Sequence, residues 1–177
     1  MKCLWLILVL LSANVASAQT KPVNWDQWSF LLGRWEAVGQ GSPGESKGGF
    51  SFALDLQRRV IVEKSHTDYA ALPGRPAFAH DDLMMIYADD SSRNFHADYY
   101  DNEGHVIRYT VEFSSDGKNI IFLSDPIPSQ PCFRLTYSRV KDSQLAIRFE
   151  IASPEAPASF KVYVEGTARK IALDQIR

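Results

Sequence analysis

Two pairs of ionisable residues in the sequence could carry acid–base chemistry. His96 and Asp98 are two residues apart in a stretch that alternates in polarity. Residues two apart point to the same face of a β-strand, so the carboxylate can orient the imidazole as a general base. The other face of this stretch carries Phe95, Ala97 and Tyr99 and is the more apolar one. The alternation therefore places His96 and Asp98 on the outside of the protein, as an exposed pair.

Glu63 and His66 form the second pair, in a stretch whose alternation is ambiguous. One face carries Lys64 and His66, and the other carries Glu63 and Thr67. Whichever face points inward takes an ionisable group into a mostly apolar interior, which is costly unless that group is paired. The stretch therefore indicates a site for water or for a polar group of a ligand. The alternative is that these residues hydrogen-bond to their neighbours at the edge of the core.

Metal and cofactor motifs are weak in this sequence. His80, Asp81 and Asp82 resemble a metal site in composition, but neighbouring strand residues point to opposite faces, so the three cannot hold one ion without a bend. Residues 39–44 match G-x-G-x-x-G, but no crossover helix follows them, as a dinucleotide site requires. The motifs H-E-x-x-H, G-x-S-x-G and C-x-x-C do not occur. We therefore predict no metal ion and no cofactor.

Aromatic residues are frequent at the positions that the alternation turns inward. They could simply fill a core, or they could line a cavity with apolar walls and a few hydroxyl groups, as in many small-molecule sites. We favour the cavity and expect a small, largely hydrophobic ligand in it. The residues expected to line this site are Trp35, Phe52, Glu63, His66, Tyr99, Tyr109, Tyr137 and Phe149. Trp35 is also expected to pack at one end of the fold, against Arg169.

The elements that must position these side chains show an apolar period of two. Clear examples are the stretches 50–56, 107–113, 145–151 and 160–164. This pattern is typical of antiparallel strands with one buried and one solvated face. Short turn signals, such as Asp116-Gly117, separate the stretches. We predict about ten strands, near residues 34–40, 47–56, 59–68, 82–88, 93–101, 105–114, 118–124, 132–140, 144–152 and 159–169.

Sequential hairpins without long crossovers favour an all-β, single antiparallel up-and-down barrel over a sandwich, because closure removes exposed edges. One short helix is predicted over residues 24–32, capped by Asn24, stopped by Gly33 and suited to plugging one end of the barrel. The Pro-rich stretches 69–81 and 125–131 are predicted to be irregular. The first is long enough to be either a lid over the barrel mouth or a plain surface loop.

The N-terminus has the pattern of a secretory signal peptide. Lys2 precedes the apolar run 4–11, and Ala16-Ser17-Ala18 is a small-residue cleavage site. The run is too short for a membrane-spanning helix, which needs about 20 residues. We therefore predict a signal peptide over 1–18 that is cleaved after Ala18, a barrel domain over 19–177, no stable membrane insertion, and a secreted or periplasmic location. Cys132 is then the only cysteine, and no internal disulfide is expected.

The segment FLLGRWEAVGQG at residues 30–41 resembles the opening of DUF1579-type and nitrobindin-type proteins in the calycin group, where a short helix leads into a Gly-x-Trp strand. Gly33-Arg34-Trp35 is also similar to the start of lipocalins, and residues 83–89, 95–104 and 164–170 are further matches. The resemblance implies a lipocalin-like barrel with an internal cavity and no well-defined shared activity. Nitrobindin-type haem binders carry a histidine near the C-terminus. This chain has none after His105, so haem binding is not expected.

Composition limits the remaining functions. With 19 basic and 21 acidic residues the formal net charge is −2, which gives no electrostatic case for a nucleic-acid partner. Our first hypothesis is a secreted or periplasmic barrel that binds a small hydrophobic molecule without catalysis. The alternatives are a hydrolase- or isomerase-type enzyme that uses Glu63 and His66, or His96 and Asp98, and a solid barrel with a structural or partner-binding role. The oligomeric state stays open.

Overall fold

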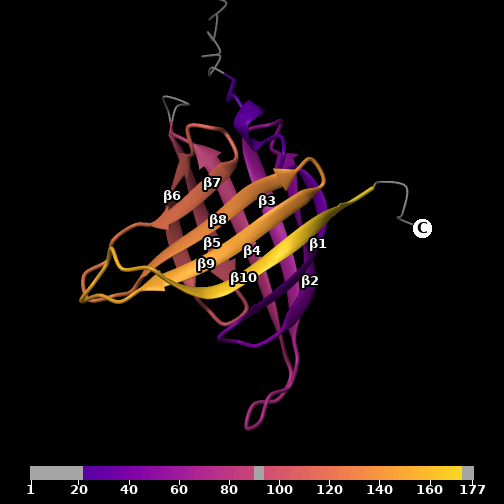
Figure 1. The fold of residues 1–177 in the computed structure, drawn as a ribbon. Helices are drawn as coiled ribbons and strands as arrows, with labels where there is room; N and C mark the ends of the chain where they lie inside the picture. The colour runs from indigo at the N-terminus through magenta and orange to yellow at the C-terminus, as the bar shows by residue number, and fades with distance from the viewer. Residues whose placement is uncertain (1–21, 90–93, 173–177) are drawn as a thin grey trace, which may run out of the picture.

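The computed structural model describes residues 22–89 and 94–172, which form a closed barrel (Figure 1). Its strands are β1 (Gly33–Gly41), β2 (Ser46–Asp55), β3 (Val60–Tyr69), β4 (Phe78–Ala88), β5 (Phe95–Asp101), β6 (Val106–Phe113), β7 (Asn119–Ser124), β8 (Cys132–Lys141), β9 (Gln144–Ala152) and β10 (Lys161–Ile171). Each strand pairs antiparallel with its neighbours in the chain, and β1 pairs with β10 to close the sheet. The predicted all-β, up-and-down barrel of ten strands is confirmed.

The alternation of each strand decides which residues face the interior. In β3, Ile61 and Glu63 are buried while His66 is exposed. In β4, Met84 and Ile86 are buried, and the register sets Glu63 opposite Met84 and Ile61 opposite Ile86. Residues that are opposite each other in an antiparallel pair point to the same side of the sheet. Glu63 therefore faces the barrel interior together with its apolar neighbours.

The predicted helix over residues 24–32 is wrong, because the chain forms a single 3-10 turn there, Asp26–Trp28. The Oδ1 atom of Asn24 accepts a hydrogen bond from the backbone N–H of Asp26 at 2.8 Å, as a cap would. A segment this short is below the length at which an isolated helix is stable. The side chains of Trp25, just before the turn, and of Trp28, within it, are instead buried against the ring of Phe95 in β5. A helix that plugs the barrel is therefore not supported.

The Pro-rich stretch 69–81 is more regular than predicted. β3 continues to Tyr69 and β4 begins at Phe78, and the rings of these two residues stack with centroids 4.7 Å apart. The connection is reduced to residues 70–77, and Figure 1 shows this hairpin pointing away from the barrel body instead of folding over it. The hairpin does not have the shape of a lid. Residues 125–131 are irregular, as predicted.

Two strand glycines let the barrel wall coil tightly. A Cβ atom on Gly48 in β2 would lie 2.1 Å from the carbonyl oxygen of His66 in β3, and one on Gly166 in β10 would lie 2.5 Å from that of Val38 in β1. Such approaches leave no room for a side chain, so a larger residue would push neighbouring strands apart. The register places both glycines at interior positions, so they add no bulk to the lumen.

The predicted signal peptide, residues 1–18, lies outside the described residues. Within residues 22–89 and 94–172, no helix is long and apolar enough to cross a membrane.

Candidate functional site

One half of the barrel interior is an aromatic core, which we call the closed half. Trp28, from the turn before β1, is fully buried, and its ring centroid lies 5.3, 5.4 and 5.9 Å from those of Phe95, Phe113 and Phe122. These contacts are edge-to-face, a favourable arrangement for aromatic rings. Other fully buried side chains of this half are Leu31, Ile61, Ile86, Ala97, Ile120 and Leu145. The closed half is therefore packed like a protein core.

The inward-facing residues of the other half, which we call the open half, are less completely buried. Its inward-facing residues are half-buried: Ser65, Thr67, His80, Asp82, Tyr99, Ile107, Phe133, Leu135, Ile147 and Phe149. A side chain that points into a closed barrel meets solvent through the barrel mouth. The change from full to partial burial therefore shows that the interior is less tightly filled toward the end of the barrel where β3 ends and β4 begins.

Glu63 and Asp82 lie at the boundary between the two halves. Glu63 is 2% exposed, and the side chain of Asp82 is 15% exposed. The two carboxyl groups share a hydrogen bond, Ser65 donates to Asp82, and the backbone N–H of Met84 donates to Glu63. The Oε2 atom of Glu63 is buried and has no hydrogen-bond partner among the described residues. Leaving such an acceptor unpaired costs about 1–3 kcal/mol.

The surroundings of this carboxyl pair decide which member is protonated. Burial raises the pKa of Glu63 well above its ordinary value, and the negative charge of Asp82 raises it further. Burial also raises the pKa of Asp82, but the hydrogen bond with Glu63 and the charge of His80 oppose that rise. Glu63 is therefore the group that keeps a proton and donates it to Asp82. Of the two carboxyl groups, Asp82 is therefore the one that ionises first as the pH rises.

Three tyrosines, Tyr99, Tyr109 and Tyr137, surround the carboxyl pair. Burial raises the pKa of all three hydroxyl groups, and the charge of Asp82 adds to each rise. The hydroxyls therefore stay protonated and can each donate and accept a hydrogen bond. The ring of Tyr137 meets that of Phe52 edge-to-face, with centroids 5.4 Å apart. These aromatic rings form the floor of the open half.

A chain of hydrogen bonds leads from this floor to the surface through His80. The Nε2 atom of His80 lies 2.9 Å from the hydroxyl of Tyr99 and 3.6 Å from Oδ2 of Asp82. Its Nδ1 atom lies 2.9 Å from Oε1 of Glu103, an exposed residue in the turn after β5. Both nitrogen atoms of the imidazole are therefore engaged by the protein.

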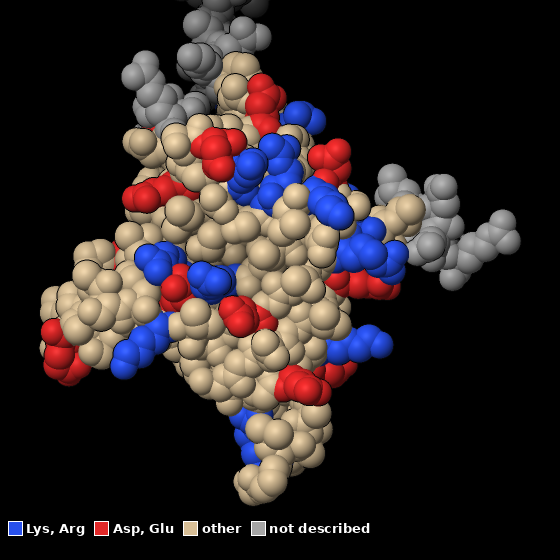
Figure 2. Space-filling model, in the orientation of Figure 1, with Lys and Arg blue, Asp and Glu red and all other residues tan. Residues whose placement is uncertain are grey.

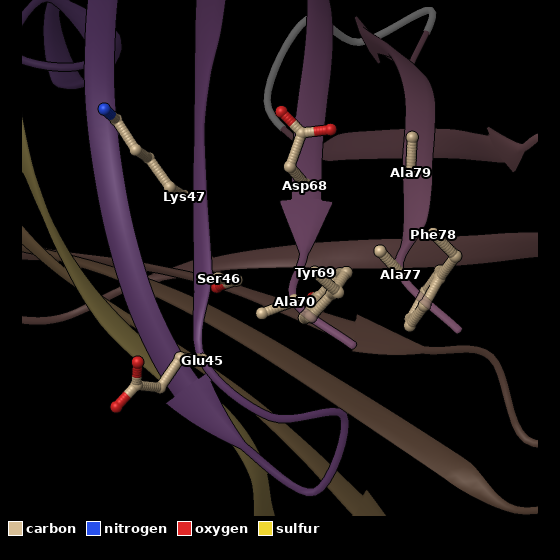
Figure 3. A pocket seen from close by; sticks show the side chains of 9 residues that line it. All are labelled: Glu45, Ser46, Lys47, Asp68, Tyr69, Ala70, Ala77, Phe78 and Ala79. Atoms are coloured by element: carbon tan, nitrogen blue, oxygen red, sulfur yellow. The ribbon is translucent and has the colours of Figure 1, made fainter. Parts of the chain in front are cut away.

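A surface pocket of about 640 Å³ lies at the rim of the mouth (Figure 3). It is lined by Glu45, Ser46, Lys47, Asp68, Tyr69, Ala70, Ala77, Phe78 and Ala79. Figure 3 shows the rings of Tyr69 and Phe78 side by side where β3 ends and β4 begins. Burial raises the pKa of the Tyr69 hydroxyl, and the charges of Asp82 and Glu103 contribute to the rise. Tyr69 therefore lies close to the acidic groups at the mouth.

Most of the residues predicted to line a ligand site face the interior of the barrel. These are Trp35, Phe52, Glu63, Tyr99, Tyr109, Tyr137 and Phe149. Trp35 belongs to the closed half, where its Nε1 donates to the carbonyl oxygen of Leu31 at 2.8 Å. The predicted contact with Arg169 is wrong, because Lys170 lies over the Trp35 ring, with Nζ 5.1 Å from its centroid, and Arg169 pairs with Glu36.

His66 lies on the outer face of β3, so its predicted place in the lumen is wrong. Its Nδ1 atom is 2.6 Å from Oδ1 of Asp81, and both side chains are 56% exposed. Glu63 and His66 therefore face opposite sides of one strand and cannot act on one substrate in the lumen. His96 and Asp98 flank the buried Ala97 and point outward, as the alternation predicts. Neither pair proposed for an enzyme forms a lumen site.

Sequence reasoning missed Asp82 and His80, which it considered only as metal ligands. Both face inward on β4, while Asp81 between them faces outward, as the alternation requires. Within the described ranges, no group of three or more His, Cys, Asp or Glu side chains is placed to hold a metal ion. Asp82 lies two and four residues before the apolar Met84 and Ile86, and this spacing puts it on the same inward face of the strand.

The outer face of β8, β9 and β10 carries a separate groove of about 870 Å³. Arg134 donates two hydrogen bonds to Glu150 there, at 2.7 and 2.9 Å, and its guanidinium carbon lies 4.2 Å from the centroid of the Phe160 ring. Figure 2 shows basic and acidic groups interspersed over this side of the molecule. Both arginines of this groove, Arg134 and Arg148, are therefore paired within the protein, with Glu150 and Glu165.

Known structures share the fold of this chain. Rv2717c from M. tuberculosis superposes with a TM-score of 0.59 and 12% identity, over 84% of this chain and 97% of that protein. The S-type phycobiliprotein lyase CPES from Guillardia theta gives a TM-score of 0.52 and 7% identity, over 82% and 90%. At this identity the likeness shows the fold alone, a closed lipocalin-like antiparallel barrel. Neither protein-family models nor curated proteins give a match.

Proposed function

We propose that this chain is a binding protein that takes a small, largely hydrophobic molecule into the open half of its lumen without chemical conversion. The observation that carries the proposal is the half-burial of apolar side chains that point into a closed barrel. Apolar area left partly in water favours a ligand that covers it, at about 25 cal/mol for each Å². A lumen with apolar walls and a few polar groups is typical of small-molecule sites.

The walls of the open half provide the apolar surface. Phe133 and Phe149 stack across β8 and β9 with centroids 5.9 Å apart, and Leu135 and Ile147 continue this surface toward the floor. The floor supplies hydroxyl and carboxyl groups from Tyr137 and its neighbours. This division into apolar walls and a polar floor supports binding of a molecule with an apolar body and a polar end.

We also propose that the protein is exported after cleavage behind Ala18 and is related to the DUF1579-type proteins of the calycin group. The support for export is the sequence pattern of residues 1–18. Expression of the full chain in a Gram-negative host, followed by N-terminal sequencing of the product, tests it. A mature protein that begins at Gln19 in the periplasmic fraction is the expected result, and a product that keeps the leader in the cytoplasm would contradict it.

A fluorescence titration with the neutral apolar dye N-phenyl-1-naphthylamine tests binding in the lumen. Leu135 points inward from β8 and Thr136 points outward, so Leu135→Trp fills the lumen and Thr136→Trp is its matched control. We expect the wild-type protein and Thr136→Trp to bind the dye with similar affinity. Leu135→Trp should weaken binding by about tenfold or more, because the indole occupies the site of the dye.

Ile147→Trp, from the facing strand β9, provides a second lumen-filling variant if Leu135→Trp fails to fold. Circular dichroism and a thermal unfolding curve establish that each variant keeps the fold. Saturable dye binding that is unchanged in both lumen-filling variants would place the dye elsewhere and overturn the proposal. The absence of saturable binding to the wild-type protein would favour the solid barrel with a structural role.

A further inference from the structure

We infer that the Glu63–Asp82 pair is the recognition site for a positively charged amine on the ligand. The inference rests on the proposed function and deepens it, because it assigns the chemical class of the polar end of the ligand. An ammonium group brings three N–H donors and one positive charge. Three observations at the floor of the open half point to such a group.

The first observation is the unpaired oxygen of Glu63. Oε2 is buried in a residue that is 2% exposed, and no described group donates to it. Buried polar atoms are nearly always hydrogen-bonded, so an unpaired acceptor at the end of an open lumen indicates that an external donor completes it. An N–H group of a bound molecule would supply the donor that this oxygen does not find among the described residues.

The second observation is that no lysine or arginine of the surrounding strands faces the pair. The basic residues of strands β2 to β6 are Lys47, Lys64 and Arg108, and all three occupy outward positions. His80 is the one inward-facing basic group of these strands. Its Nε2 atom lies 3.6 Å from Oδ2 of Asp82 but closer to the Tyr99 hydroxyl, at 2.9 Å, and its Nδ1 atom pairs with Glu103. Among these strands, His80 is therefore the one cationic neighbour of the pair, and it is shared with a second carboxylate.

The third observation is the set of acceptors that surround the pair. Tyr99, Tyr109 and Tyr137 contribute hydroxyl oxygens to the same floor, and Asp82 feels the charge of Asp101 as well. A carboxylate or phosphate ligand would be repelled by these groups. An amine would gain from them, because a desolvated ammonium needs several acceptors to replace its hydration. A neutral alcohol would satisfy one acceptor and would bring no positive charge.

Competition between ligands of equal length isolates the charge of the polar end. The reporter is N-phenyl-1-naphthylamine bound to the wild-type protein at neutral pH, and the competitors are octylamine, octanol and octanoate. Octylamine is protonated at neutral pH, as a lysine side chain is. We expect octylamine to displace the dye at a concentration about tenfold or more below that of octanol. Octanoate should be the weakest competitor.

Two variants at the pair and one outside the lumen assign the preference to these carboxyls. Asp82→Asn removes the negative charge, and Glu63→Gln replaces the protonated carboxyl with a neutral donor. The exposed Asp81→Asn, on the outer face of β4, is the control. In Asp82→Asn, we expect the concentrations of octylamine and octanol that displace half of the dye to lie within about twofold of each other. In Asp81→Asn, the ratio of these two concentrations should stay as in the wild-type protein.

The outcomes separate this inference from the proposed function. If the dye binds in the lumen but octylamine competes no better than octanol in the wild-type protein, the amine site is wrong and the binding protein stands. The same conclusion follows if the preference for octylamine survives in both Asp82→Asn and Glu63→Gln. If neither pair variant folds, the wild-type ratio alone decides. If the dye itself does not bind, the proposed function fails first.

Discussion

At the scale of single residues, the proton held by Glu63 links the stability of the barrel to pH. Burial raises the pKa of this carboxyl in the folded chain, whereas in the unfolded chain it ionises near its ordinary value. Between these two pKa values the folded chain binds more protons than the unfolded chain does. The stabilising effect is therefore complete below the unfolded value and is lost as the pH rises through the folded value.

Glu63→Gln should remove this pH dependence. The amide is neutral at every pH and can still donate a hydrogen bond to Asp82. We expect the free energy of unfolding of the variant to exceed that of the wild type at neutral pH, and the gap to close in mild acid near the ordinary pKa of glutamate. Urea unfolding across a pH series measures it, with the exposed Glu112→Gln as the control. A gap that stays constant with pH would contradict the assignment of the proton to Glu63.

The sequence located Glu63 but could not decide its orientation. Both faces of the stretch 60–67 carry ionisable residues, so alternation alone does not reveal which face is inward. The decision comes from the register with β4, where Met84 lies opposite Glu63 and Asp81 lies opposite His66. Cross-strand register depends on the pairing of the whole sheet, so it cannot be derived from the alternation of one strand.

At the scale of elements, Gly48 tests how tightly β2 and β3 are joined. Gly48→Ala sets a methyl group 2.1 Å from a backbone oxygen of β3, and the backbone cannot yield as a flexible side chain does. We expect a loss of about 2–4 kcal/mol in the free energy of unfolding, measured by urea denaturation. Ser51→Ala, on the outer face of the same strand, should stay within about 0.5 kcal/mol of the wild type. Equal stability of the two variants would show that the strands separate without cost.

The strands were predictable, and the exceptions have physical causes. The alternation of apolar and polar residues over 107–113 and 145–151 predicts half-buried strands. The 24–32 segment has helix signals, but burial of its tryptophans against Phe95 outweighs the weak local preference for helix. The proline-rich stretch 69–81 was predicted to be irregular, yet part of it extends β4 and carries His80 into the lumen.

At the scale of the whole molecule, the pairing of β1 with β10 joins the two ends of the chain and closes the barrel. Val38 and Thr167 are exposed partners across this closure. A disulfide between Val38→Cys and Thr167→Cys, in a Cys132→Ser background without residues 1–18, would enclose most of the domain. We expect the oxidised form to be more stable than the reduced form by about 3–4 kcal/mol, since long loops lose the most entropy on closure.

Urea unfolding with and without a reductant measures this difference in one protein. The Val38→Cys single variant in the same background is the control and should respond to neither condition. If the double variant fails to form the disulfide under oxidising conditions, the two strands are not neighbours in solution and the barrel is open at this seam.

Because the closed half is filled around Trp28, a ligand in the proposed site would enter and leave through the open half. A bound ligand would then dissociate along the path by which it entered, and a second ligand would bind only after the first has left. The rate of ligand exchange would then be set by the dissociation rate constant of the bound ligand and would not rise with the concentration of the incoming ligand. Tyr69 and Phe78 stack at this end of the barrel, so they would affect association and dissociation of the proposed ligand alike, and with them the rate of exchange. The residues of the floor, around Glu63 and Asp82, would set the selectivity of the site among ligands.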